Sequence, residues 1–98
     1  MAKFGELINS EIPVLIDFYV EWEDATNDLH SVLRDVAAAL GDKAKIIKID
    51  VNKNEVLANA LRIKGNPTFI IYKDGEMKWR QTGEQDANTL INLVEQYV

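Results

Sequence analysis

The chain contains no cysteine, only two prolines and only five glycines among its 98 residues. Without cysteine there is no disulfide bond, no thiolate nucleophile and no metal site built on thiolate ligands. No apolar run approaches the roughly 20 residues needed to cross a bilayer, so no membrane partner is expected. The start, Met1 to Glu6, carries an acid and lacks the uninterrupted apolar stretch of a signal peptide. We therefore expect a cytoplasmic protein.

Positive charge is also scarce, because 11 lysines and arginines stand against 16 acids and leave a net charge of −5. The sequence contains no Lys/Arg cluster, so we expect no nucleic acid partner, since binding to phosphates depends on such clusters. The length and the hydrophobic content of 47% fit one globular domain over residues 1–98. We expect it to be a monomer.

Apolar periodicity predicts an α/β protein with the element order α-β-α-β-α-β-β-α. The first two strands, which a helix connects, should be parallel, and the last two should form a hairpin. The result is a four-stranded mixed sheet flanked by helices. The expected helices span residues 4–9, 26–40, 54–62 and 87–97, and the expected strands span residues 14–20, 45–51, 68–73 and 76–82.

Several finer expectations concern which side chains face the core. Gly41 should end the long helix and Asp86 should cap the last one. Asp74–Gly75 should form the tight turn of the hairpin. Met77 and Trp79 are expected on one side of the last strand, in the core. The apolar stripes of the helices are expected to consist of Leu29, Val32, Leu33, Val36, Ala37 and Leu40 in the second, Val56, Leu57, Ala60 and Leu61 in the third, and Leu90, Ile91, Val94 and Tyr97 in the last.

Five segments together resemble the thioredoxin family. They are Val14 to Trp22, Lys48 to Asn52, Ile63 to Thr68, Tyr72 to Gly75, and Gly83. The resemblance implies a thioredoxin-like fold in a short version without the N-terminal strand of longer members. In that family Cys-Gly-Pro-Cys follows the tryptophan, but here those positions read Glu23-Asp24-Ala25-Thr26. Disulfide exchange needs one thiolate to attack and a second thiol to resolve the intermediate. Glu23 and Thr26 can do neither, so we expect no catalytic residue, no enzyme activity and no cofactor.

A binding role requires no thiol, and the resemblance indicates where binding would occur. In the family the proline matching Pro67 is cis, and the backbone of the residue before it, here Asn66, pairs with an extended peptide. The sequence therefore predicts a redox-inactive module that binds an unidentified protein or extended peptide. Two alternatives stay open: a thioredoxin that acts in redox homeostasis by descent, and a structural or designed scaffold without a ligand. The candidate surface consists of Trp22, Glu23, Asp24, Ala25, Thr26, Asn66, Pro67 and Gly83.

Asp17 is a lone carboxylate in a strand that should be buried on both faces. Burial disfavours the charged form, so the pKa of Asp17 should be raised. By resemblance to the family, Lys48 on the neighbouring strand is its partner. We interpret the pair as a structural remnant, satisfied by Lys48 or by water, rather than as catalytic machinery.

Four acids, Glu21, Glu23, Asp24 and Asp28, surround the start of the long helix. The helix dipole favours carboxylates there, by a few tenths to about 1 kcal/mol each. Their spacing is not that of a calcium loop, so no metal site is expected. His30 has no partners for acid–base chemistry in the sequence, and we expect it to face solvent.

Overall fold

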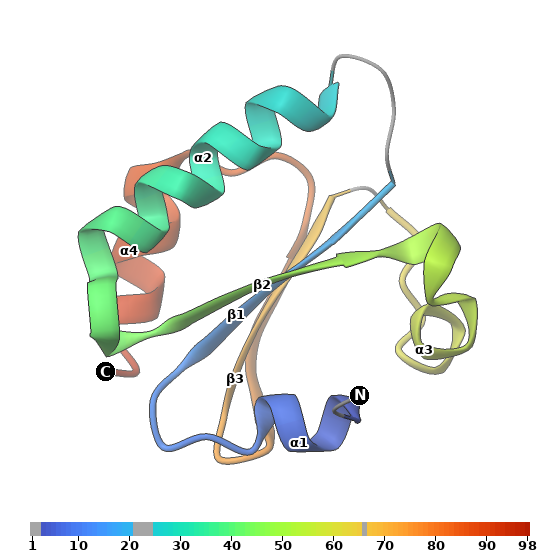
Figure 1. Cartoon of the computed structure of the whole chain (residues 1–98), viewed down its shortest axis with the longest axis horizontal. Helices are drawn as coiled ribbons and strands as arrows, with labels where there is room; N and C mark the ends of the chain where they lie inside the picture. Colours follow the sequence, from blue (N-terminus) through green and yellow to red (C-terminus); the bar gives the residue numbers. More distant parts are fainter. Residues whose placement is uncertain (1–2, 21–24, 66) are drawn as a thin grey trace.

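Helices and strands alternate in the order that the apolar periodicity predicts (Figure 1). The computed structural model of the chain describes residues 3–20, 25–65 and 67–98. Every expected element is present, with ends that differ by at most two residues. The elements are α1 (Phe4–Ile8), β1 (Val14–Tyr19), α2 (Ala25–Leu40), the 3-10 turn η1 (Gly41–Lys43), β2 (Lys45–Asp50), the 3-10 turn η2 (Val51–Lys53), α3 (Glu55–Ala60), β3 (Thr68–Lys73), β4 (Glu76–Thr82) and α4 (Ala87–Glu95).

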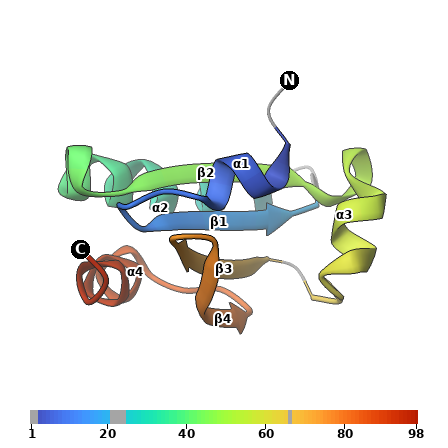
Figure 2. The ribbon, with the colours of Figure 1, turned by 90° about the horizontal axis from the view of Figure 1, so that it is seen from below.

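The four strands form one mixed sheet in the order β2-β1-β3-β4. β1 runs parallel to β2 and antiparallel to β3, and β3 forms an antiparallel hairpin with β4. β1 is therefore paired on both sides, and its near-continuous apolar sequence matches burial on both faces. β2 and β4 are the two edges of the sheet (Figure 2). The predicted four-stranded mixed sheet is confirmed, and the first described element is α1, with no described strand before it.

Helices cover both faces of the sheet and enclose two apolar clusters (Figure 2). Helices α2 and α4 cover one face, where Leu33 and Leu90 pack against Phe69. Helices α1 and α3 cover the other face, where Phe4 packs edge-on against Tyr72 with ring centroids 5.5 Å apart. We call these the α2/α4 face and the α1/α3 face. Side chains of β1 alternate between them, so Asp17 shares the α2/α4 face with Leu15.

The hairpin turn is held against the end of α1. Asp74 and Gly75 have φ angles of 54° and 80°, the left-handed pair that a two-residue turn of this kind requires. The amide of Asp74 donates to the carbonyl of Ser10 at 2.8 Å, and that of Gly75 donates to Ile8 at 3.1 Å. The predicted Asp-Gly turn is confirmed, and it also supplies donors to the carboxyl end of a helix.

The expected apolar stripe of α3 is correct for two of its four residues. Leu57 and Leu61 pack against the α1/α3 cluster, but Val56 is 86% exposed and Ala60 is exposed, whereas Ala58 is buried. The helix is only six residues long and follows a 3-10 turn, so its apolar pattern alone does not decide which side is buried. Ala37 of α2 is likewise exposed rather than buried.

The expectation that Met77 and Trp79 share one side of β4 is also wrong. Ile71 pairs with Trp79 but Tyr72 pairs with Met77, so Lys78 is an extra residue in a β-bulge. A bulge shifts the side-chain alternation by one residue. Trp79 packs on the α2/α4 cluster, whereas Met77 is 45% exposed.

The phase of α3 can be tested by substitution. Ala58→Leu should lower the free energy of unfolding by about 1–3 kcal/mol, because a larger side chain overpacks the contact with the sheet. Val56→Ser should change it by less than about 0.5 kcal/mol, because the side chain lies in solvent. Urea denaturation of both variants measures the difference. A larger loss for Val56→Ser than for Ala58→Leu would show that Val56, and not Ala58, is the buried residue.

Candidate functional site

The candidate site lies at one end of the sheet, where β1 and β4 end and β3 begins. Phe18 pairs with Thr68, and Thr68 pairs with Thr82, so the three strands are in register at this end. Pro67 and Gly83 lie immediately beyond these pairs. The carboxyl end of β1 and the beginning of α2 lie toward the same end of the molecule (Figure 1). Open α/β sheets place their sites where strands end in this way.

Two of the predicted site residues are brought into direct contact. The amide of Gly83 donates to the carbonyl of Pro67 at 2.8 Å. Gly83 has a φ of 107°, a conformation that side chains with a Cβ rarely adopt. The predicted juxtaposition of Pro67 with Gly83 therefore exists, and it depends on glycine.

The remaining predicted site residues are placed only in part. Ala25 and Thr26 form the beginning of α2. Trp22, Glu23, Asp24 and Asn66 lie outside the described residues, and with them the isomer of the Asn66–Pro67 bond. The same holds for the acid at position 21 and for the side chains of Asp28 and His30.

A pair of threonines holds the segment before Pro67 in place. Thr68 is fully buried, and its hydroxyl donates to the carbonyl of Gly65 at 2.9 Å. The hydroxyl oxygen of Thr82 lies 3.2 Å from that of Thr68. A hydroxyl has one proton to donate, so Thr82 is the donor to Thr68. A Cβ at Gly65 would collide with the methyl group of Thr82, so the close approach of the two segments requires glycine here.

Arg80 holds the beginning of the same segment, where the chain leaves α3. Its guanidinium donates to the carbonyl of Leu61 at 2.6 Å and to that of Arg62 at 2.8 Å. These carbonyls follow α3, where helix hydrogen bonding stops and acceptors need other donors. Arg62 has a left-handed φ of 56°, so the chain reverses sharply at this point. The arginine and the threonine pair together position the backbone that leads into Pro67.

Sequence reasoning missed Thr82 and Arg80. Their hydrogen-bond partners lie 14 to 19 residues away in the chain, so no local sequence pattern predicts these contacts. The one available signal was an arginine and a threonine among the residues that end the last strand.

Asp17 is fully buried, as expected, and Lys48 is its neighbour on β2, as expected, but no hydrogen bond joins the two side chains. Both carboxylate oxygens lack a hydrogen-bond partner among the described residues. Lys48 is the register partner of Asp17 on β2, yet its side chain extends to the exposed surface. The expectation that Lys48 or water satisfies the carboxylate is therefore not met by Lys48 through a hydrogen bond.

Burial controls the titration of this group. Desolvation raises the pKa of Asp17 from its usual 3.8 to about 7, and the charge of Lys48 partly offsets the rise. The predicted direction is confirmed. Near neutral pH the residue is thus divided between a neutral acid and a buried anion, and no described group accepts or donates a proton beside it.

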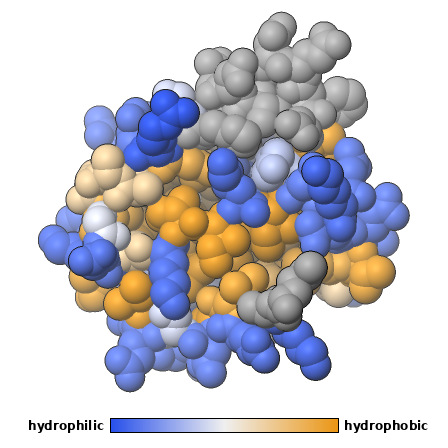
Figure 3. Space-filling view, in the orientation of Figure 1, coloured by the Kyte–Doolittle hydropathy of each residue, from blue (hydrophilic) through white to orange (hydrophobic). Residues whose placement is uncertain are grey.

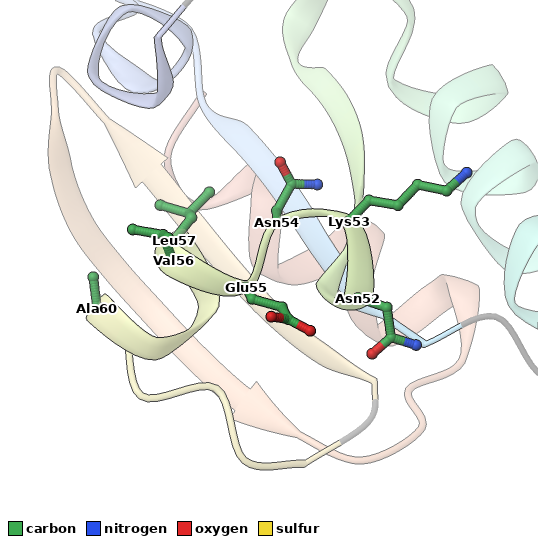
Figure 4. A pocket seen from close by; sticks show the side chains of 7 residues that line it. All are labelled: Asn52, Lys53, Asn54, Glu55, Val56, Leu57 and Ala60. Carbon is green, nitrogen blue, oxygen red and sulfur yellow. The ribbon is translucent and has the colours of Figure 1, made fainter.

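A shallow depression of about 670 Å³ lies elsewhere, around η2 and α3 (Figure 4). Asn52 and Glu55 point to one side of it, while Val56 and Leu57 point to the other. These side chains do not converge on one point, and none of the predicted site residues lines the depression. It does not resemble a ligand pocket. No described helix is long and apolar enough to cross a membrane.

Comparison with known proteins gives consistent matches. The model of the family described as Thioredoxin matches residues 1–96. Chloroplastic thioredoxin Y from Oryza sativa is 41% identical over 95 residues, which are 96% of this chain and 56% of that protein. Thioredoxin from Rickettsia prowazekii is 28% identical over 94 residues, which are 96% of this chain and 90% of that protein. The chain thus spans about half the length of the plant relatives.

Solved structures agree in fold. A thioredoxin mutant from Halobacterium salinarum matches with a TM-score of 0.82 and 33% identity, over 95% of this chain and 80% of that one. Chloroplastic thioredoxin z matches with a TM-score of 0.81 and 31% identity, over 93% of this chain and 82% of that one. The thioredoxin-like fold expected from the sequence is confirmed.

Asp17→Asn should stabilise the protein, and the gain should depend on pH. The raised pKa means that the folded state holds the proton more tightly than the unfolded chain. Stability therefore falls as pH rises from about 4 to about 7 and is level above that. The variant should gain little at pH 4 and at most about 4 kcal/mol at pH 8. Denaturation at both pH values measures the gain. An NMR titration that places the pKa of Asp17 near 4 would contradict the argument.

Gly65→Ala should destabilise the segment before Pro67 by about 1–3 kcal/mol, because the new methyl group meets the side chain of Thr82. Gly65→Ala combined with Thr82→Ser should recover part of the loss, because serine lacks that methyl but keeps the hydroxyl. Thermal unfolding of the two variants and of Thr82→Ser alone measures the coupling. Additive losses would rule out the collision as the cause.

Proposed function

This chain belongs to the thioredoxin family, and we propose that it is a redox-inactive member that binds an extended segment of another protein at the Pro67 end of its sheet. One observation carries the proposal: the sequence contains no cysteine at all, while the backbone that leads into Pro67 is held by Thr68, Thr82 and Arg80.

Thiol chemistry is excluded by composition. A reductase needs a thiolate to attack and a second thiol to release the product. The positions that carry them in the family are Glu23 and Thr26. A carboxylate and a hydroxyl do not exchange with a disulfide under ordinary conditions, so the family's reaction has no nucleophile in this protein.

Peptide binding makes a different demand, because main-chain groups supply the affinity in strand addition. The proposed partner of the bound segment is the backbone of Asn66, between Gly65 and Pro67. The hydrogen bonds at Gly65, Pro67 and Gly83 fix the residues on both sides of it. Backbone groups fixed in advance lose little entropy on binding, which supports the proposal.

Charge sets the proposed selectivity. Glu23 and Asp24 belong to the candidate surface, so a basic or neutral segment should bind better than an acidic one. No covalent intermediate holds the complex together. The binding should therefore be weak and quickly reversible.

The alternative from another class is a disulfide oxidoreductase by descent, the activity that the names of the relatives imply. The absence of cysteine opposes it. A scaffold without a ligand is a third possibility. The cytoplasmic location and the monomeric state stay predictions.

Insulin reduction and peptide titration together test the proposal. The protein should not accelerate insulin reduction by dithiothreitol above the buffer rate. A labelled extended peptide with basic residues should shift the amide signals of residues 22–26, 65 and 83, and an acidic peptide of equal length should not. Glu23→Lys with Asp24→Lys should reverse this preference. Measurable turnover would support the oxidoreductase, and no shift with any peptide would support the scaffold.

A further inference from the structure

A second surface that could bind another protein is the outer edge of β2. Among the described residues β2 pairs with β1 only. The view in Figure 1 looks onto this edge, and Figure 2 shows β2 as the outermost strand on that side, opposite β4. An edge strand carries a row of unpaired amides and carbonyls, which is a template for another strand.

The direction of the backbone groups follows from one hydrogen bond. The amide of Lys45 donates to the carbonyl of Pro13 at 2.9 Å, so this residue points toward β1. Backbone groups alternate in direction along a strand. Ile47 therefore also points inward, while the amides and carbonyls of Ile46 and Lys48 point outward from the sheet. These two residues are the groups that an added strand would use.

The surface over this edge is apolar. Ile46 and Ile47 are only half-buried, although they belong to the two clusters on opposite faces of the sheet. Figure 3 shows apolar side chains gathered across the centre of this face, over β2, with hydrophilic side chains around them. A strand that covered β2 would remove this apolar area from water.

Positive charge is concentrated on and beside β2, although no cluster of basic residues was expected from the sequence. Residues 43–53 hold four of the chain's 11 basic residues and a single acid, in a protein with a net charge of −5. That acid, Asp50, already accepts the amide of Asn52 as the cap of η2. The four basic residues are Lys43, Lys45, Lys48 and Lys53, and Lys45 and Lys48 are exposed on β2 itself.

We propose that the outer edge of β2 binds an extended acidic segment of a partner protein, which joins the sheet as a fifth strand. Charge selects the occupant. A second copy of this chain would bring Lys45 and Lys48 close to their equivalents, and lysine on an edge strand opposes such self-pairing. A segment with acidic residues instead meets opposite charge along the strand.

The side-chain pattern of the bound segment follows from the pleat. Ile46 and Lys48 lie on the α2/α4 face of the sheet, and Lys45, Ile47 and Ile49 lie on the α1/α3 face. Neighbouring residues in a sheet that face the same side contact each other. Each face of the bound segment should therefore carry both acidic residues, for the lysine, and apolar residues, for the isoleucines. This is the opposite charge preference to that of the Pro67 end, so the two surfaces can be tested separately.

The test uses a labelled peptide with the repeat Glu-Glu-Val-Val, which places glutamate and valine on both faces of a strand, and a Lys-Lys-Val-Val peptide of equal length as its control. Binding is followed by fluorescence anisotropy and by hydrogen exchange of single amides. The glutamate peptide should slow exchange at the amides of Ile46 and Lys48, which point outward. It should not change the exchange of the amides of Ile47 and Ile49, which already donate hydrogen bonds to β1. The lysine peptide should bind at least about fivefold more weakly.

Three variants separate charge from backbone pairing. Lys45→Glu should weaken binding of the glutamate peptide about fivefold or more, whereas Arg34→Glu, an equal charge change at an exposed position of α2, should leave it unchanged. Lys48→Pro removes an outward amide that the fold does not use. The Lys48→Pro variant should bind the glutamate peptide about fivefold more weakly than the Lys48→Gln variant, which has lost the same charge but keeps the amide.

Each result decides for or against the proposal. Slowed exchange confined to Ile46 and Lys48, with a gap between Lys48→Pro and Lys48→Gln, supports strand addition. Equal loss in Lys45→Glu and Arg34→Glu would show charge attraction without a site, and would overturn it. Protection of the same amides without peptide, rising with protein concentration, would assign the edge to a second copy instead. Signal changes at residues 65 and 83 alone would place the peptide at the Pro67 end.

Discussion

Burial of β1 on both edges and on both faces is the constraint from which the rest of the structure follows. β2 pairs only with β1 among the described strands, and the hairpin of β3 and β4 is joined to β2 only through β1. Both apolar clusters contain side chains of β1. A strand in that position should be wholly apolar, yet it carries Asp17 without a hydrogen-bond partner among the described residues. The protein retains a group whose charged form opposes folding. The sequence contains no thiol that the acid could serve, which agrees with its interpretation as a structural remnant.

The candidate site shows how chemistry and geometry can separate in evolution. The reactive groups of the family are side chains in a loop, and four substitutions are enough to remove them. The backbone that leads into Pro67 is held by the hydrogen bonds of Arg80 and of the threonine pair. Those residues lie on β3 and β4, away from the loop in sequence. Loss of the first set therefore leaves the second set intact, and this is why a binding role outlasts a redox role in our proposal.

Much of the fold could be predicted from sequence, because long periodic segments and turn residues carry local information. The twofold-buried β1, the Asp-Gly turn and the Asp86 cap, which accepts the amide of Thr89, are all of this kind. Short or irregular segments were less predictable. Which residues of α3 are buried depended on tertiary packing, and the bulge at Lys78 depended on cross-strand register. The role of Arg80 could not be predicted, because its acceptors are backbone carbonyls, which any residue type supplies. The charge along β2 was visible in the sequence, but its meaning required knowing that β2 is an edge.

The hairpin turn has a consequence for the order in which the molecule folds. Asp74 and Gly75 already favour the left-handed conformation in an unfolded chain, and the strands they join are adjacent in sequence, so β3 and β4 can pair within microseconds. β1 must instead find β3 across about 50 residues, and its parallel pairing with β2 requires α2 to form as the crossover. The topology thus allows the hairpin to form before the centre of the sheet is filled. Until β1 pairs, its apolar side chains are exposed to water, and the inner edge of β3 is open to any other strand.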